Sequence, residues 1–160
     1  MHQRMRRDYF TLQVRAVDWI EGEGEPRVPH LVIRYEGPPA PFIDGITRDD
    51  EPIPADEVDI AFRLQSPLED PDATGVLSLT DRYTGEFILE VNATVDTMVR
   101  FIRAARRFGE MESVSGGRYC VDIEVDSGES FEFEKRTLLV YHADGTLLTR
   151  HSLIPSGVEL

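Results

Sequence analysis

Apolar and polar residues alternate along most of this chain, and this alternation constrains the fold more than any other feature. In the first such segment Phe10, Leu12 and Val14 alternate with Thr11 and Gln13. Because successive side chains of a strand point to opposite faces, a period of two predicts half-buried β-strands. By this pattern we predict strands at residues 10–16, 30–36, 58–64, 75–81, 86–92, 119–125, 131–133, 137–143 and 146–152.

Turn residues indicate that several neighbouring strands form hairpins. Residues 82–85 (Arg-Tyr-Thr-Gly) join two predicted strands, and Asp144-Gly145 joins the last two. Asp-Gly is a strong signal for a two-residue hairpin turn. In that last hairpin His142 and His151 lie on one face about 13 Å apart, at ~3.3 Å per residue, which is too far to share a metal ion.

One segment, residues 95–108, has the periodicity of a helix. Thr94 is the expected N-cap, and Gly109 lies just beyond the expected end. At 100° per residue the apolar positions fall on a single face. This core face consists of Val95, Met98, Val99, Ile102 and Ala105. We therefore expect one amphipathic helix that covers the sheet.

Residues 37–56 show neither pattern, since they contain five prolines and the acidic run at 49–51. We interpret this stretch as an irregular loop, and long loops are often functional or mobile. No repeat or linker divides the chain, so we predict a single acidic α+β domain over residues 1–160. Its core is a mostly antiparallel β-sheet of about eight or nine strands, curved or in two layers, packed with one amphipathic helix.

The charge of the chain indicates salt adaptation. Thirty acidic and 17 basic residues give a net charge of -13, and Lys135 is the only lysine. Such a surface repels itself in dilute buffer, whereas molar salt shortens the Debye length to about 3 Å and screens the repulsion. Arginine keeps its positive charge in a planar group that pairs well with carboxylates.

Cysteine content and hydropathy predict a cytoplasmic location. Cys120 is the only cysteine, which excludes an internal disulfide. The basic first residues lead into an alternating strand instead of an apolar signal region. We expect neither a signal peptide nor a membrane-spanning segment.

The sequence predicts no catalytic residue, no metal site and no cofactor. It contains no P-loop, no GxGxxG, no GxSxG, no HExxH and no CxxC motif. Asp122 would raise the pKa of the nearby Cys120 thiol, which disfavours a nucleophilic role. One cysteine and four scattered histidines are a poor set of ligands for structural zinc.

Two clusters of arginine depart from the acidic composition. Arg100, Arg103 and Arg107 form a stripe on the helix opposite its apolar face, and Arg6 and Arg7 form a cluster near the N-terminus. These groups either pair with carboxylates of the same chain or form a surface that binds anions or a protein partner. A contact surface should leave at least two of the three helix arginines exposed and unpaired.

Four short sequences carry a resemblance to a known family. They are residues 5–10 (MRRDYF), 70–75 (DPDATG), 101–107 (FIRAARR) and 152–157 (SLIPSG). Over nearly its whole length the chain resembles a family of small conserved haloarchaeal proteins of unknown function. The resemblance agrees with salt adaptation and a cytoplasmic location, and it implies no activity or site residues.

We expect a non-enzymatic binding or adaptor protein that acts within a cytoplasmic protein complex. A first alternative is an enzyme or small-ligand-binding domain with a pocket between the sheet and the Pro-rich residues 37–56. A second alternative is an RNA- or ribosome-associated protein that uses both arginine clusters, although phosphate binding weakens as salt rises.

The last residues of the chain are unexpectedly apolar. Leu153, Ile154, Val158 and Leu160 lie in an eight-residue stretch. Exposed apolar surface becomes less favourable under salting-out conditions, so we expect these side chains to be buried. We predict that the tail packs on the core of its own domain.

Overall fold

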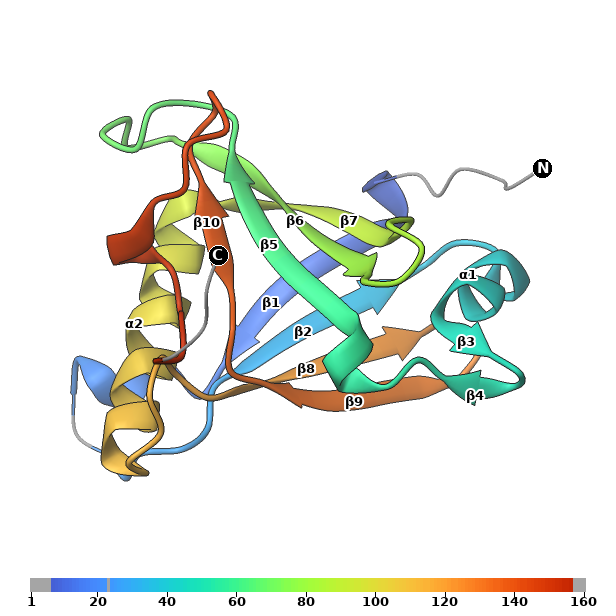
Figure 1. Ribbon diagram of the computed structural model, residues 1–160, viewed down its shortest axis with the longest axis horizontal. Coiled ribbons are helices and arrows are strands. Elements are labelled where there is room, and N and C mark those ends of the chain that lie inside the picture. The colour runs from blue at the N-terminus through green and yellow to red at the C-terminus, as the bar shows by residue number, and fades with distance from the viewer. Residues whose placement is uncertain (1–6, 23, 157–160) are drawn as a thin grey trace.

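The computed structural model describes residues 7–22 and 24–156, and its strands form two four-stranded sheets and one short ribbon (Figure 1). The first sheet has the order β1-β2-β8-β9, with the bounds Phe10–Arg15, His30–Tyr35, Tyr119–Val125 and Ser130–Lys135. The second has the order β10-β5-β6-β7, with the bounds Leu139–Tyr141, Val58–Leu64, Thr74–Asp81 and Phe87–Thr94. The ribbon pairs β3 (Thr47–Arg48) with β4 (Glu51–Pro52).

The predicted α+β class is confirmed, with one main helix packed on sheets that form two layers. Most strand pairs are antiparallel, as expected, but each large sheet also contains one parallel pair. These pairs are β2 with β8 and β5 with β10. The two sheets lie side by side at β1 and β7, and their inner faces form one core.

The core follows from the alternation of the strands. In β8 the residues Tyr119, Val121, Ile123 and Val125 are buried, while the residues between them are half-buried. Burial of each large apolar side chain contributes roughly 1.5–3 kcal/mol relative to exposure. The outer face of the first sheet therefore carries the polar positions, among them His30 on β2 and Asp122 on β8.

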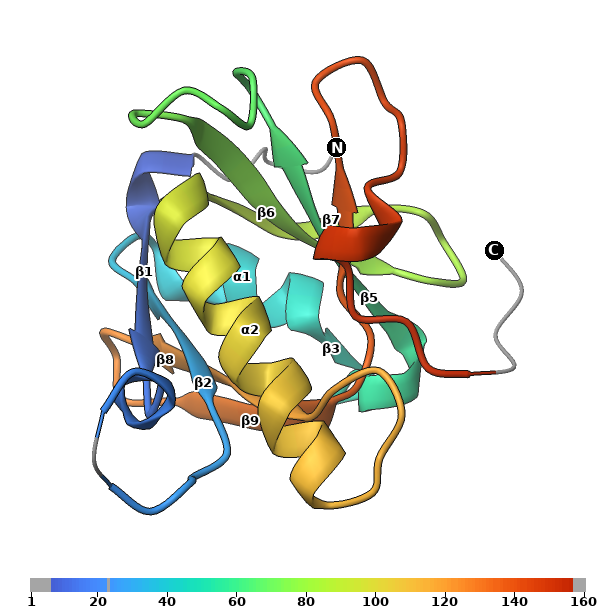
Figure 2. The same ribbon diagram turned by 90° about the vertical axis from the view of Figure 1, so that its left-hand side faces the viewer.

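Helix α2 (Val95–Met111) lies across one end of the two sheets (Figure 2). The Thr94 side chain accepts a hydrogen bond from the Thr97 amide at 3.2 Å, which confirms the predicted N-cap. Phe101 is fully buried, and its ring packs edge-on against Tyr119 with centroids 5.3 Å apart. The helix continues past Gly109, which is buried against Gly117.

The Pro-rich stretch is ordered, so its interpretation as an irregular loop was wrong. It contains helix α1 (Pro39–Ile46), the β3–β4 ribbon and the short 3-10 helix η3 (Ala55–Glu57). Prolines are tolerated in the first helical turn because those backbone amides need no partner within the helix. The Phe42 ring stacks on Tyr35 at 4.7 Å, which holds α1 against the first sheet.

The last predicted hairpin is only partly correct. β10 pairs in parallel with β5, and the return segment is not a strand but contains the 3-10 helix η4 (Thr149–His151). Isolated bridges join Tyr141 to Leu147 and Leu138 to Leu153. The Ser152 hydroxyl accepts from the Val140 amide and donates to the Leu148 carbonyl, both at 2.8 Å. The Ser152 hydroxyl thus binds the Val140 amide, which a backbone carbonyl would bind in a regular hairpin.

The C-terminal tail packs on the domain at the described positions. Leu153 is fully buried in the common core, and Ile154 is half-buried. Val158 and Leu160, which the prediction also included, lie outside the described residues. The expectation that the tail packs on its own core is therefore confirmed for Leu153.

Candidate binding groove

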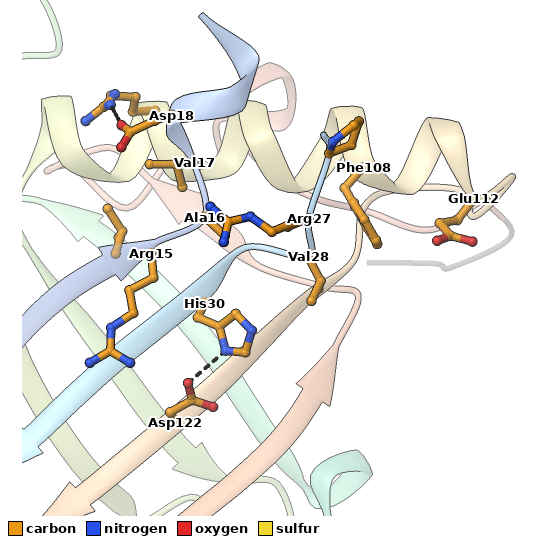
Figure 3. A pocket seen from close by; sticks show the side chains of 13 residues that line it. Arg15, Ala16, Val17, Asp18, Arg27, Val28, His30, Phe108, Glu112 and Asp122 are labelled. Carbon is orange, nitrogen blue, oxygen red and sulfur yellow. Dashed lines mark hydrogen bonds and ion pairs between the residues drawn. The ribbon is translucent and has the colours of Figure 1, made fainter. Parts of the chain in front are cut away.

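An open groove of about 1020 Å³ lies between α2, the loop that follows β1 and the outer face of the first sheet (Figure 3). β1, β2 and β8 contribute Arg15, His30 and Asp122, and the loop contributes Arg27. Arg100, Phe108 and Glu112 line the groove from the side of the helix. The fold thus brings charged side chains together from distant parts of the sequence.

His30 and Asp122 form the central polar pair of the groove. The parallel register places His30 beside Cys120 and Val32 beside Asp122, so the two polar side chains share the outer face. His30 Nδ1 lies 2.7 Å from Asp122 Oδ2 (Figure 3). The other carboxylate oxygen, Asp122 Oδ1, is buried and has no hydrogen-bond partner among the described residues. The contact with His30 is therefore the one hydrogen bond of this carboxylate among the described residues.

Two arginines of the groove are exposed and have no carboxylate partner in the part of the chain that the structure describes. Arg15 lies opposite His30 in the β1–β2 register, and Arg27 extends from the loop toward Ala16 (Figure 3). Several other arginines do form ion pairs, namely Arg48, Arg82, Arg100, Arg107 and Arg118. In a chain of net charge -13, unpaired guanidinium groups in a groove can bind an anionic group.

The loop after β1 is held in place by a strained turn and by ion pairs to α2. Ala16 has φ 60°, a left-handed conformation that is uncommon for residues other than glycine, and its carbonyl accepts a hydrogen bond from Trp19 Nε1 at 2.5 Å. Arg100 of α2 forms an ion pair with Asp18, and its Nε lies 3.4 Å from Glu21 Oε1. These contacts fix the wall of the groove.

The predicted arginine stripe is divided among different contacts. Arg100 pairs with the loop, and Arg107 lies 3.5 Å from Glu110 on the same helix. Of these three helix arginines, only Arg103 is exposed and has no carboxylate partner within residues 7–22 and 24–156, so the condition of two unpaired arginines is not met. Arg6 lies outside the described residues, and Arg7 falls in the short 3-10 helix η1 (Arg7–Tyr9) without a described side chain.

A second cavity, of about 490 Å³, lies beneath the Pro-rich stretch, where the first alternative placed a ligand pocket. Pro52, Ile53, Pro54 and Ala55 line one side, and the strand β9 lines another. Its remaining lining is mainly apolar and includes Val58, Leu79 and Ile88. Two titratable residues, Glu132 and Glu134, also line it, but among the residues described no hydrogen bond joins them as one joins His30 to Asp122.

The surroundings of Cys120 disfavour a nucleophilic role for its thiol. Burial raises the pKa of the Cys120 thiol, and the carboxylates of Glu134, Glu132 and Asp122 raise it further, which disfavours the reactive thiolate. Within residues 7–22 and 24–156, no group of three histidine, cysteine or acidic side chains is placed to hold a metal ion. Nor does that part of the chain contain a helix long and apolar enough to cross a membrane.

Fold and groove together define a two-layer α+β domain with a polar surface groove. The chain belongs to the DUF5793 family, a family of unknown function, whose model matches residues 5–160. The resemblance to a family of unknown function is thereby confirmed over nearly the whole chain. No curated protein and no solved structure matches it.

No pattern in the sequence predicts this groove. Arg15, His30 and Asp122 were visible as polar positions on predicted strands, but no local signal showed that they meet. Their proximity depends on the parallel pairing of β2 with β8. Arg27 lies in a loop without a periodic pattern.

Proposed function

We propose that this protein is a non-enzymatic binding protein that holds a carboxylate-bearing segment of a protein partner in the groove. The observation that carries the proposal is the pair of exposed arginines, Arg15 and Arg27, which have no carboxylate partner among the described residues. Guanidinium groups bind carboxylates in a two-pronged geometry that gives both affinity and orientation. The open shape of the groove suits an extended segment better than a small enclosed metabolite.

The negative charge of Asp122 and of the whole chain favours a peptide over a nucleic acid as the ligand. Asp122 adds a negative charge to the groove lining, and this charge repels phosphate oxygens. A peptide supplies carboxylates for Arg15 and Arg27 at a lower charge density than a phosphate backbone. The net charge of -13 also opposes the approach of a densely charged phosphate backbone.

The cellular setting belongs to the same proposal. The single cysteine and the excess of arginine over lysine support a cytoplasmic, salt-adapted protein, of haloarchaeal origin by the sequence resemblance. In this setting, contacts between charges weaken with screening, so hydrogen-bond geometry carries more of the binding. The protein would then act as an adaptor within a larger complex.

The proposal is tested by titrating a labelled polyglutamate peptide into the protein at low and at molar KCl. The variant Arg15→Gln/Arg27→Gln should weaken binding by about tenfold or more, which corresponds to about 1.4 kcal/mol. A matched control is Arg136→Gln/Arg150→Gln, which removes the same charge from exposed positions outside the groove. This control should bind with nearly the affinity of the unmodified protein.

Two outcomes would contradict the proposal. Equal losses in both double variants would show that net charge, not the groove, determines binding. Tighter binding of a single-stranded RNA than of the peptide at molar KCl would favour the RNA-associated alternative instead.

A further inference from the structure

The outer edge of β9 has backbone groups that are free to pair with another strand. β9 is the last strand of the first sheet, so β8 is its only neighbour in that sheet. The Val125 amide donates to the Glu129 carbonyl at 2.9 Å, and the register continues through Ile123 with Phe131 and Val121 with Phe133. In an antiparallel ladder, every second residue bonds to the same neighbour. Phe131, Phe133 and Lys135 therefore bond to β8.

The intervening residues of β9 point their amides and carbonyls away from β8. These residues are Ser130, Glu132 and Glu134. The hydrogen bonds between β8 and β2 support this assignment. The Cys120 amide donates to the Pro29 carbonyl on the β2 side, so Cys120 is not one of the β8 residues that bond to β9. No backbone partner for the outward groups of the three β9 residues exists among residues 7–22 and 24–156. An edge with open donors and acceptors can be extended by an added strand.

A cavity, not a covering strand, lies beside this edge. All residues from Ser130 to Glu134 line the cavity of about 490 Å³, and residues 52–55 line its other side. Pro52 and Pro54 have no backbone N–H, which makes this wall a poor partner for β9. Lys135 anchors one end, because its ammonium donates to the carbonyls of Ala55 and Val58 at 2.8 and 2.7 Å.

The side chains of β9 define what an added strand must carry. Phe131 and Phe133 are half-buried toward the cavity, whereas Glu132 and Glu134 are exposed on the opposite face. Side chains of neighbouring strands pair across the ladder, and opposite charges stabilise such pairs. Glu134 is already paired with Arg118, whose Nε lies 2.5 Å from Glu134 Oε1. A strand beside β9 therefore needs apolar residues on the face of the cavity and a basic residue opposite Glu132.

We infer that β9 accepts an extended segment of a partner protein in which apolar and basic residues alternate, as an added strand of the first sheet. Main-chain hydrogen bonds supply the affinity, and the two rows of side chains supply the specificity. A second copy of β9 is disfavoured as the partner, because glutamates of both strands would face one another. This surface is separate from the arginines of the proposed groove and requires a partner of opposite charge.

Hydrogen–deuterium exchange with an alternating valine–arginine peptide at millimolar concentration tests the inference. Binding should slow exchange at the outward amides of Glu132 and Glu134 by about tenfold or more, and it should change exchange at the amides of Phe131 and Phe133 much less. A peptide of the same composition with its valines and arginines in separate blocks is the first control. An alternating valine–glutamate peptide is the second, and neither control should protect the two amides.

The variant Glu132→Pro separates backbone pairing from charge attraction. It removes an outward N–H that the ladder to β8 does not use, and proline is tolerated on such an edge. This variant should keep the fold by circular dichroism and lose peptide binding at least about tenfold, whereas Glu132→Gln should lose less. If the Glu132→Pro variant does not fold, the hydrogen–deuterium exchange of the unmodified protein is sufficient to test the inference.

Several results would overturn the inference. These are unchanged exchange at Glu132 and Glu134 with the alternating peptide, equal protection by the block peptide, or undiminished binding to a folded Glu132→Pro variant. Uptake of an apolar dye into the cavity without protection of either amide would instead assign the cavity to a small ligand. None of these results depends on Arg15 or Arg27, so the two proposals stand or fall separately.

Discussion

The ammonium group of Lys135 lies 2.7 Å from the carbonyl oxygen of Val58, so the only lysine of the chain joins β9 of one sheet to β5 of the other. Burial lowers the pKa of Lys135, and Arg82 lowers it further, whereas Asp59 and Asp56 raise it. Its second acceptor, the Ala55 carbonyl, lies at 2.8 Å. Lys135 therefore stabilises the contact between the sheets mainly by satisfying two backbone carbonyls.

Replacement of this lysine should destabilise the domain. Lys135→Met leaves the carbonyls of Ala55 and Val58 without their donor, and we expect a loss of about 1–3 kcal/mol in the free energy of unfolding. The adjacent Arg136→Met is the matched control, since Arg136 is exposed and a surface change of this kind is usually within about 0.5 kcal/mol. Urea denaturation of both variants measures the difference, and equal midpoints would refute the role of Lys135.

Replacement of two helical glycines by alanine should change the free energy of unfolding in opposite directions. A Cβ on Gly45 of α1 would meet no atom within 4 Å, so Gly45→Ala should stabilise by about 0.5–1 kcal/mol through helix propensity. A Cβ on Gly109 of α2 would lie 2.8 Å from the Gly117 Cα, and Gly109→Ala should destabilise by about 1–3 kcal/mol. Chemical denaturation compares the two, and stabilisation by both would contradict the close approach at Gly109.

Asp81 should contribute to stability in a pH-dependent way. Burial raises the pKa of its carboxyl, but hydrogen bonds from Arg48 and from the Tyr83 and Thr84 amides outweigh burial, so the pKa lies below its usual value of 3.8. As the pH falls, the unfolded chain therefore binds this proton first. The stabilisation is complete above the unfolded pKa and is lost as the pH falls through the lower folded pKa.

The variant Asp81→Asn keeps an acceptor for the two turn amides and removes the charge that pairs with Arg48. Its stability should decrease less than that of the unmodified protein as the pH is lowered below about 4. Asp44→Asn, at an exposed position of α1, should retain the acid sensitivity of the unmodified protein. Thermal melts over this pH range test the difference, and parallel curves for all three proteins would contradict it.

Stability should increase with salt. A net charge of -13 on one domain produces self-repulsion that salt screens, so the melting midpoint should rise from dilute buffer to molar KCl. Asp44→Asn/Asp50→Asn removes two exposed negative charges and should reduce this rise. A midpoint that stays constant or falls with KCl would refute salt adaptation.

Hydrophobic alternation predicted most strands because each sheet buries only one of its faces. In β5, for example, Val58, Ile60, Phe62 and Leu64 are buried, and Asp59 and Arg63 are exposed. The same pattern carries no information about strand direction. The parallel pairs β2–β8 and β5–β10 join segments far apart in the sequence, and so they could not be predicted.

Two local errors have clear physical causes. The prolines of α1 suggested a loop, yet Pro39 is the first residue of the helix, where a missing N–H costs no hydrogen bond. The spacing of Phe42 and Ile46, both buried, was the available signal for a helix. In the last hairpin, the Ser152 hydroxyl binds the Val140 amide, which a pattern of hydropathy does not show.

The candidate groove was beyond prediction for a related reason. Alternation places Arg15, His30 and Asp122 on polar faces, but their distances depend on strand order and register. The pairing of Arg100 with Asp18 likewise depends on how the loop after β1 meets α2. The sequence predicts a stripe of arginines on the helix, but the arrangement of the loop and the sheets determines which arginines have a carboxylate partner.

The parallel pairings determine when this chain can fold during its synthesis. β1 and β2 are synthesised early and pair with each other, but β2 gains its second neighbour only when β8 follows, and β5 gains its second neighbour only when β10 follows. Pairing between segments so distant in sequence is slow, and unpaired edges are prone to aggregate until it is complete. A nascent chain that ends before Tyr119 therefore has two incomplete sheets, in which one edge of β2 and one edge of β5 are still unpaired.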